Sequence, residues 1–444
     1  MERMFKYALL FVAAMVLTTG MTSCSDSDDD NADRVKEQNE TLEAVTRQYL
    51  NAVVYPTYTG LANSADELYN LIFALKTKVN GGQPATRSEV DAICAKYKEA
   101  RKYWEQSEAF LFGAATDFDI DPWIDTWPLE VDILAKDLND ETIVGRLDQA
   151  AKDGNVAFVT PENRGFHGIE FIFFRDGKNR DVAIFNNDVV ENYTYKGEEY
   201  FKGMEVTGKE ELAFAAAVAA DLRDKVFQLE VAWVGTTATK AHVDRVNVCK
   251  KEKAADNYET LAKSGLAYGA DLLNVGTGKS YNTWKKVMET IFVGGCSNIC
   301  AEVADQKMGQ AYRAAVGKPE TREDEETGEL VEDDPNYIES PYSYNSFTDF
   351  KDNIVSIKNS LYGNVEKNTW EANSIMAYLR TYLPEQANEL QSKLASALAA
   401  LDKCLAAKQA FVQNPGATYV KDAMDEITEL DDYLNEVSRE LLKN

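Results

Sequence analysis

Residues 61–104 decide the fold class and read LANSADELYNLIFALKTKVNGGQPATRSEVDAICAKYKEARKYW. In the first half, apolar residues recur in steps of three and four, at Leu61, Ala65, Leu68, Ile72, Leu75 and Val79. The second half repeats this spacing at Val90, Ile93, Tyr97, Ala100 and Trp104. Such spacing places the apolar side chains on one face of a helix. We therefore expect two amphipathic helices here.

A short connection joins the two helices. Gly81-Gly82-Gln83-Pro84 interrupts the pattern, and Thr86 with Glu89 then has the spacing of a capping box. Two helices joined so closely form an antiparallel pair, which is the unit of a helical bundle. Further leucine stripes follow near the C-terminus, whereas strand-like alternation is confined to the stretch around 189–206. The sequence predicts an all-α protein.

The length of the chain indicates more than one domain, because 444 residues exceed the usual size of a single core. The helical pattern is weakest at 186–208, where we place the boundary between an N-terminal bundle (37–195) and a C-terminal bundle (209–444). Residues 319–337 are acidic and poor in apolar side chains, and we expect an exposed loop. Each half has a tryptophan-bearing helix, so an internal duplication is plausible, although no residue-level repeat establishes it.

The N-terminus reads MERMFKYALLFVAAMVLTTGMTSC over residues 1–24. Basic residues at its start precede an apolar stretch, as in a secretory signal. The small residues before Cys24 resemble a bacterial lipobox, so we expect residues 1–23 to be removed and Cys24 to carry a lipid. The alternative is an ordinary signal peptide with an incidental cysteine.

Residues 24–36 are expected to form an acidic linker. The run of aspartates in it resembles the export tag of Bacteroidetes surface lipoproteins, although a solvated linker explains the same residues nearly as well. The predicted location is the outer membrane in the cell envelope, facing the periplasm or the cell surface. The lipid would be the only contact with the membrane.

The net charge of −27 argues against nucleic-acid binding, which needs clustered positive charge for phosphate contacts. The same charge favours the attraction of cations. The chain has six cysteines; apart from Cys24, five remain, and an odd number excludes a fully paired disulfide framework. Cys296 and Cys300 have helical spacing and are interpreted as buried free thiols, with a metal pair as the alternative.

The candidate metal ligands lie in the segment RGFHGIEF, residues 164–171. His167 and Glu170 are three apart, so on a helix they share a face and can hold one cation together. The phenylalanines and isoleucines around them predict burial, and a buried ionised glutamate needs a partner or a metal. The alternative is a core histidine hydrogen-bonded to a structural glutamate.

Arg101 and Glu108 can complete this site, since seven residues span two helical turns on one face. Glu108 would add a carboxylate, and Arg101 would orient or neutralise it. The alternative is an ordinary ion pair on a helix surface. Aspartates between 117 and 125 offer further oxygen ligands without the spacing of an EF-hand. Ser346 with Asp349 is interpreted as a helix cap.

Several segments together resemble the imelysin-like family. GFHGIEF resembles its GxHxxE motif, and the run RKYWEQSEAFLFG, residues 101–113, is similar to the helix that precedes it. Residues 124–129, with Asp125 and the Trp127-Pro128 pair, resemble the Trp-Pro turn, where the family often has an asparagine. Residues 339–350, which include Ser343, match a second-half signature. The resemblance implies two helical bundles with a site near their interface, to which Asp125, Trp127 and Ser343 would contribute supporting side chains.

The resemblance leaves two classes of function open, because the family was once classed as peptidases and is linked to bacterial iron uptake. The first is a binding protein for a divalent cation, iron in the first place and zinc in the second, or for an iron-bearing ligand. Its partners would be iron-uptake proteins. The second is a metallopeptidase that uses His167 and Glu170. We favour binding, because no HExxH motif is present and a zinc peptidase normally has three protein ligands.

Overall fold

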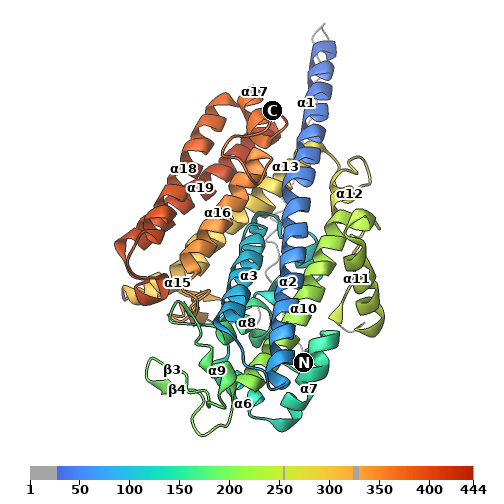
Figure 1. Ribbon diagram of the computed structural model, residues 1–444. Helices are drawn as coiled ribbons and strands as arrows, with labels where there is room; N and C mark the ends of the chain where they lie inside the picture. The colour runs from blue at the N-terminus through green and yellow to red at the C-terminus, as the bar shows by residue number, and fades with distance from the viewer. Residues whose placement is uncertain (1–27, 254–255, 324–329, 444) are drawn as a thin grey trace.

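The computed structural model describes residues 28–253, 256–323 and 330–443, and its regular structure is almost entirely helical (Figure 1). The predicted all-α class is confirmed. Cys24, the expected signal segment 1–23 and the first residues of the expected linker lie outside the described residues. Lipid attachment at Cys24 therefore stays a prediction.

The expected linker is helical where the structure describes it. Helix α1 (Asp28–Tyr49) begins within the acidic run, so the part of the linker from residue 28 to 36 is not an extended tether. The later turns of α1 bury Leu42, Val45 and Tyr49.

The first bundle contains the two helices that the opening segment predicts. After the π-helical turn η1 (Leu50–Val54), α2 (Tyr55–Asn80) and α3 (Arg87–Glu105) form the pair, and Thr86 and Glu89 make the expected capping box. Four more helices complete this bundle: α7 (Glu141–Asp153), α8 (Gly165–Phe173), α10 (Gly208–Val234) and α11 (Lys240–Glu252).

Helix α10 lies in the middle of the first bundle. It packs mainly against α2 and α7, and almost every residue along it is buried, which suits a helix with an apolar surface all round. The boundary expected within 186–208 assigns α10 to the C-terminal bundle, but its contacts are with helices of the first. The division into domains at that boundary stays a prediction.

The second bundle is formed by α16 (Ser346–Tyr362), α17 (Ile375–Tyr382), α18 (Pro384–Leu405) and α19 (Thr418–Lys443), which lie together at one side of Figure 1. Helix α16 also packs against α3 of the first bundle. Buried apolar side chains of the two bundles belong to one continuous cluster. The α3–α16 contact is therefore an internal interface, and the candidate site lies beside it.

A long apolar helical run packs against α19 and contains two π-helical stretches. It consists of α13 (Trp284–Glu289), η6 (Thr290–Ser297), α14 (Asn298–Ala301), η7 (Glu302–Lys307) and α15 (Gly309–Ala315). By length and composition this run could cross a membrane, but 61% of its most apolar window is buried inside the fold. Burial of that extent is typical of a core helix. All five described cysteines, including Cys296 and Cys300 in this run, are buried free thiols, as expected.

Strands are short and form three antiparallel hairpins: β1 (Phe174–Arg175) with β2 (Lys178–Asn179), β3 (Thr194–Tyr195) with β4 (Glu198–Glu199), and β5 (Thr321–Glu323) with β6 (Leu330–Glu332). The last pair lies within the expected exposed loop at 319–337, so the described part of that segment includes a short antiparallel strand pair.

The remaining helices are short: η2 (Glu108–Phe110), α4 (Ala114–Asp117), α5 (Ile120–Ile124), α6 (Val131–Leu138), η3 (Pro161–Asn163), α9 (Ala183–Asn186), η4 (Gly235–Thr237), α12 (Tyr268–Leu272) and η8 (Phe411–Gln413).

Candidate metal centre

Two glycines bring the start of α8 into direct contact with the segments around it. Gly165 has φ of 62°, and a Cβ atom there would lie 1.9 Å from the carbonyl oxygen of Ile124. A Cβ atom on Gly168 would lie 2.3 Å from the carbonyl oxygen of Asn163. Because neither position has room for a side chain, α8 packs closely against the end of α5. This contact places His167 next to Asp125.

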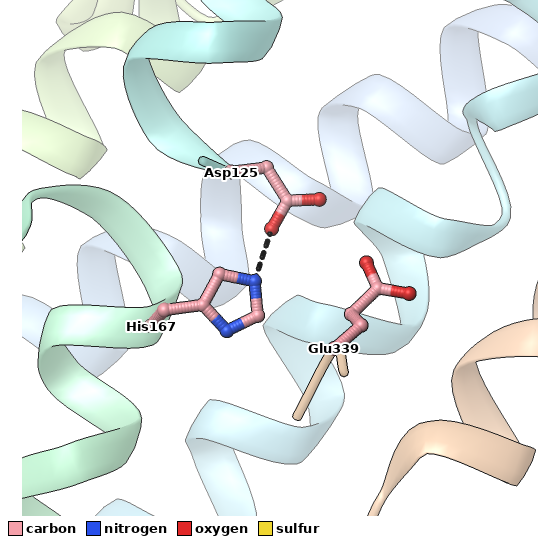
Figure 2. A group of neighbouring side chains, drawn as sticks. All are labelled: Asp125, His167 and Glu339. Carbon is pink, nitrogen blue, oxygen red and sulfur yellow. Dashed lines mark ion pairs between the residues drawn. The ribbon is translucent and has the colours of Figure 1, made fainter. Parts of the chain in front are cut away.

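The buried imidazole of His167 lies between two carboxylates. Its Nε2 atom is 3.1 Å from Oδ1 of Asp125, and its Nδ1 atom is 3.3 Å from Oε2 of Glu170. Glu339, from the loop that precedes α16, points toward the same space (Figure 2). Asp125, His167 and Glu339 each offer one donor atom within 4.8 Å of the others. This triad comes from three separate segments and is the candidate metal site.

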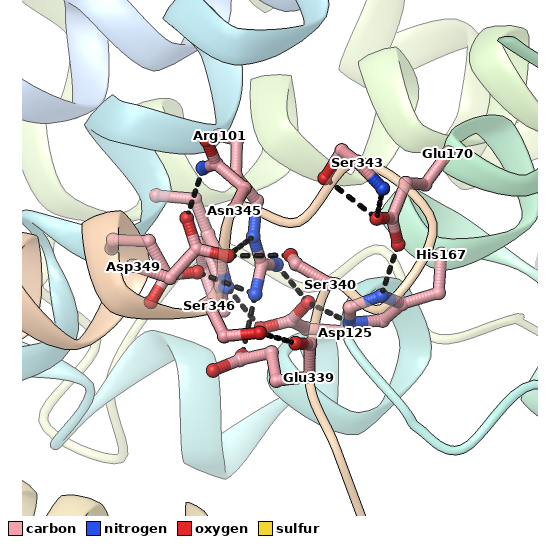
Figure 3. Close-up of polar contacts among 12 residues, drawn as sticks. Arg101, Asp125, His167, Glu170, Glu339, Ser340, Ser343, Asn345, Ser346 and Asp349 are labelled. Atoms are coloured by element: carbon pink, nitrogen blue, oxygen red, sulfur yellow. Dashed lines mark hydrogen bonds and ion pairs between the residues drawn. The ribbon is translucent and has the colours of Figure 1, made fainter. Parts of the chain in front are cut away.

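Glu170 faces His167 as predicted, but its carboxylate is already fully engaged (Figure 3). Its Oε1 atom accepts hydrogen bonds from the backbone amides of Tyr342 and Ser343, at 3.1 and 2.8 Å, and from the Ser343 hydroxyl at 2.7 Å. Its Oε2 atom is the one that faces the imidazole. The geometry therefore gives Glu170 a positioning role beside His167, and Ser343 supports it.

Arg101 is the central cation of the network, and its position differs from the prediction. The guanidinium is paired with Glu105 at 2.6 Å on its own helix and also with Asp125, Glu339 and Asp349. It therefore neutralises ligands of the triad, whereas the sequence suggested a role behind Glu108. Because Arg101 is fully buried, these contacts replace its lost hydration.

Glu108 faces a second internal cation, Lys307. The Lys307 ammonium lies 3.2 Å from Oε1 of Glu339 and 3.5 Å from Oε1 of Glu108. Glu105, Glu108 and Asp125 also bring donor atoms within 4.8 Å of one another, but Lys307 lies beside Glu105 and Glu108. Glu108 is thus close to the predicted site without belonging to the His167 triad.

The centre holds more buried carboxylates than fixed cations. Arg101 and Lys307 are the cations, and six side chains exposed by 4% or less are the carboxylates: Glu105, Glu108, Asp125, Glu170, Glu339 and Asp349. Within the described part of the chain, the Oε2 atoms of Glu108 and Glu339 have no hydrogen-bond partner. An acceptor that is buried without a partner costs free energy. One imidazole and several carboxylate oxygens fit a divalent cation such as iron or zinc.

Protons compensate part of this negative charge. Burial lowers the pKa of His167, but the carboxylates of Asp125 and Glu170 outweigh burial and raise the pKa to about 9. Burial also raises the pKa of Glu105 and of Glu108 well above the usual range. For Asp125, burial is opposed by Arg101 and His167, and the pKa falls below its usual range. A cation that enters the triad must therefore displace the proton of His167.

Trp127 lies beside the centre, and its supporting role stays a prediction. Its ring centroid lies 6.0 Å from that of His167, and the Lys307 ammonium lies 5.1 Å from it. The ring of Trp127 therefore lies between His167 and Lys307, within contact distance of both.

Four side chains of the centre were not expected from the sequence, and one pair has a role other than the expected one. Glu105, Glu339, Lys307 and Asp349 were not predicted, although Glu105 lies one helical turn after Arg101. The pair Ser346 and Asp349 does not cap α16, because Ser346 donates to the backbone oxygen of Glu339 while Asp349 pairs with Arg101. Because Arg101 is buried and needs anionic partners, Asp349 pairs with it and does not cap the helix.

Comparison with known families identifies the family of the chain. The imelysin family model matches residues 54–437. The chain belongs to the imelysin family. The matched region includes every residue of the centre, so this imelysin family member carries the expected motif in its structural context.

Two solved structures and one curated relative resemble this imelysin family member. A putative iron-regulated protein A precursor from Parabacteroides distasonis shares 22% identity with a TM-score of 0.67, over 91% of this chain and 95% of that one. An imelysin-like protein from Psychrobacter arcticum shares 14% identity with a TM-score of 0.47, over 91% and 94%. At these identities, the first likeness shows the fold.

The curated relative is the iron-regulated protein A of Synechococcus elongatus. It is 29% identical over 136 residues, which are 31% of this chain and 32% of that protein. The chain thus spans about a third of the length of the relative. The relative's name gives an iron-related role to that protein.

Proposed function

We propose that this protein binds a divalent cation, with iron first and zinc second, through Asp125, His167 and Glu339. The observation that carries the proposal is the set of three buried donors from three segments within 4.8 Å of one another. The buried carboxyl groups around the triad supply oxygen ligands, and in the described part of the chain the Oε2 atom of Glu339 has no hydrogen-bond partner. The names of the relatives from Synechococcus elongatus and Parabacteroides distasonis support iron as the first ion to test.

The wider role in this proposal is that of a cell-envelope lipoprotein in iron uptake. The signal-like residues 1–23 and the lipobox-like approach to Cys24 support export and anchoring. Mass spectrometry of protein extracted from membranes tests this part, with a diacylated or triacylated Cys24 as the expected N-terminus. A retained signal segment or an unmodified Cys24 would contradict export and lipid anchoring. Neither result would bear on cation binding.

A metallopeptidase is the alternative that the family's classification suggests. A metallopeptidase needs a free carboxylate as general base near its metal-bound water. Glu170 is poorly placed for that task, since Oε1 accepts three hydrogen bonds and Oε2 faces His167. Cleavage of a protein substrate by the metal-loaded wild type, lost in His167→Gln, would favour the enzyme over the binding protein.

Titration calorimetry under anaerobic conditions with ferrous iron, and separately with zinc, tests the cation proposal. His167→Gln and Glu339→Gln each remove one donor and should weaken binding by about tenfold or more, which corresponds to about 1.4 kcal/mol. His242→Gln is the matched control, because His242 is the other histidine and is also buried, with its Nδ1 atom 2.5 Å from Oε2 of Glu230. Equal affinity in the wild type and the two site variants would overturn the proposal.

A further inference from the structure

A separate cavity of about 620 Å³ opens beside the metal centre. Four parts of the chain supply its walls: the stretch from Pro128 to Asp132, the β1–β2 hairpin, the β3–β4 hairpin and residues 334–344. The β3–β4 hairpin projects from the molecule next to α9 in Figure 1. A cavity of this size matches the range of small-molecule sites in proteins, about 300–1,000 Å³.

Tyrosines line much of the cavity: Tyr193, Tyr195, Tyr200, Tyr342 and Tyr344. The ring of Tyr193 stacks with Tyr195 and Tyr200 at centroid distances of 6.4 and 5.7 Å, which holds these rings in place. Burial raises the pKa of Tyr193 and of Tyr342 above the usual range, so both phenols stay neutral. The rings therefore offer aromatic faces and hydroxyl groups but no phenolate ligands.

Two basic side chains of the protein already lie over these rings. The Lys196 ammonium lies 5.2 Å from the ring centroid of Tyr195, and the Arg175 guanidinium lies 5.0 Å from that of Tyr193. A cation over an aromatic face within about 6 Å is attracted by the ring quadrupole. The cavity thus has the kind of surface that accepts a positively charged organic group.

The charges in the lining are strongly negative. Six carboxylates line the cavity: Glu130, Asp132, Asp176, Glu198, Glu199 and Asp334. The lining contains two basic residues, and both have partners in the protein. Arg175 pairs with Glu191 at 3.2 Å, and Lys196 donates to Asn336 at 2.6 Å. Two of the lining carboxylates also have cations outside the lining, since Lys202 pairs with Glu199 at 2.7 Å and Lys136 pairs with Asp132 at 3.0 Å. A positively charged ligand would therefore meet chiefly the other four.

These carboxylates do not converge on one point. Among the described residues, two groups of three ligand atoms are close enough to hold a metal ion, and both lie in the buried centre. Neither group includes a carboxylate of the cavity. The six carboxylates instead come from four separate segments around the opening. Separated negative charges above aromatic faces suit a flexible ligand with several separated positive charges, because each ammonium group can meet its own carboxylate.

We propose that this cavity binds an organic cation with more than one ammonium group, of the alkyl polyamine class. The ammonium groups pair with carboxylates such as Glu198 and Asp334, and the methylene segments lie on the tyrosine rings. This site is distinct from the cation triad and does not depend on it. The two share a wall, however, since Tyr342 lines the cavity while its backbone amide binds Glu170.

Titration calorimetry with spermidine on the mature chain tests the proposal, with tetraethylene glycol as a neutral probe of similar length. Spermidine should bind and tetraethylene glycol should not. The double variant Glu198→Gln/Glu199→Gln should bind spermidine about tenfold more weakly, a loss of about 1.4 kcal/mol. Glu366→Gln is the matched control, because this exposed glutamate lies beyond the end of α16 that is distant from the cavity.

The aromatic contribution is tested separately at Tyr195. Tyr195→Phe keeps the ring and should bind spermidine like the wild type, whereas Tyr195→Leu should bind more weakly. Binding should also persist in His167→Gln, which leaves the cavity intact. Loss of spermidine binding in His167→Gln with retention in the double variant would place the ligand in the buried centre and overturn the proposal. Equal binding of both probes, displacement by equimolar magnesium, or no spermidine binding would overturn it as well.

Discussion

Glu170 orients His167, because its Oε2 atom lies 3.3 Å from Nδ1 of the imidazole. Three hydrogen-bond donors fix the other oxygen of the Glu170 carboxylate. Two residues three apart on a helix can share a metal ion, but here one of them orients the other. We therefore expect different losses of cation affinity when His167 and when Glu170 is changed.

Glu170→Gln should weaken cation binding less than His167→Gln does. The side-chain amide oxygen of the introduced glutamine can still accept from Tyr342 and Ser343. The loss should stay below the roughly tenfold loss expected of His167→Gln, because the group that orients the imidazole is changed but the ligand atom of the ring is kept. Glu170→Ala should also lower stability, since each buried amide left without an acceptor costs about 1–3 kcal/mol. Calorimetry and urea unfolding measure the two effects. An affinity loss as large as that of His167→Gln would identify Glu170 as a ligand.

Cation binding should release a proton and strengthen as the pH rises toward 9. A free imidazole titrates at about 6.5, but the pKa of His167 is about 9, and only the neutral ring can bind a metal. Calorimetry at pH 7.5 in two buffers of different ionisation enthalpy measures the protons released. Cation binding to His167→Gln should release about one proton fewer than binding to the wild type. An affinity that is constant from pH 7 to 9 would contradict the assignment.

The same pKa shift predicts how the cation-free protein responds to pH. Because the folded-state pKa of His167 lies above its unfolded value, the stabilisation is fully present below pH ~6.5 and disappears as the pH rises through about 9. Its size is on the order of 3 kcal/mol. Urea unfolding of the wild type and His167→Gln at pH 6 and pH 9.5 measures it. The stability difference between the two proteins should shrink at the higher pH.

Lys307→Met should create a second cation site. The ammonium of Lys307 lies within 4 Å of Glu105, Glu108 and Glu339, and methionine has a similar length without the charge. Without Lys307, the donors of Glu105, Glu108 and Asp125 are available to another ion. The stoichiometry of zinc binding should rise from one to two, with lower stability before zinc is added. A stoichiometry that stays at one would show that Glu105 and Glu108 do not hold a second ion.

Asp224→Asn should destabilise the first bundle by about 3–5 kcal/mol, since it leaves buried cations without their anion. Asp224 pairs with Lys253 and Arg223 at 2.8 Å each, and also with Arg245. Burial opposes ionisation, but these cations lower the pKa of Asp224 to about 2. The stabilisation is therefore present above pH ~3.9 and is lost as the pH falls through about 2.

Acid unfolding followed by circular dichroism measures this effect. The exposed pair of Asp425 with Lys421 is the control, and Asp425→Asn should change stability by less than about 1 kcal/mol. Equal sensitivity of the two variants to acid would show that the buried network around Asp224 contributes no more than a surface ion pair.

The sequence by itself determined the helical class, because the apolar spacing of Leu61 to Val79 and of Val90 to Trp104 is a local property of the chain. It also determined that His167 and Glu170 share a helical face. Helix periodicity and capping depend on neighbours three or four residues apart, so a linear pattern is sufficient to predict them.

Only the tertiary structure decided which side chains meet at the site. Asp125, Lys307 and Glu339 join His167 from distant segments, because Gly165 and Gly168 let α8 pack closely and the π-helical segment η7 carries Lys307 inward. The roles also follow from burial: a carboxylate in water is a free ligand, whereas Glu170 must satisfy three buried donors first. Local spacing contains no information on these long-range contacts, so the candidate ligand set became visible only in the folded chain.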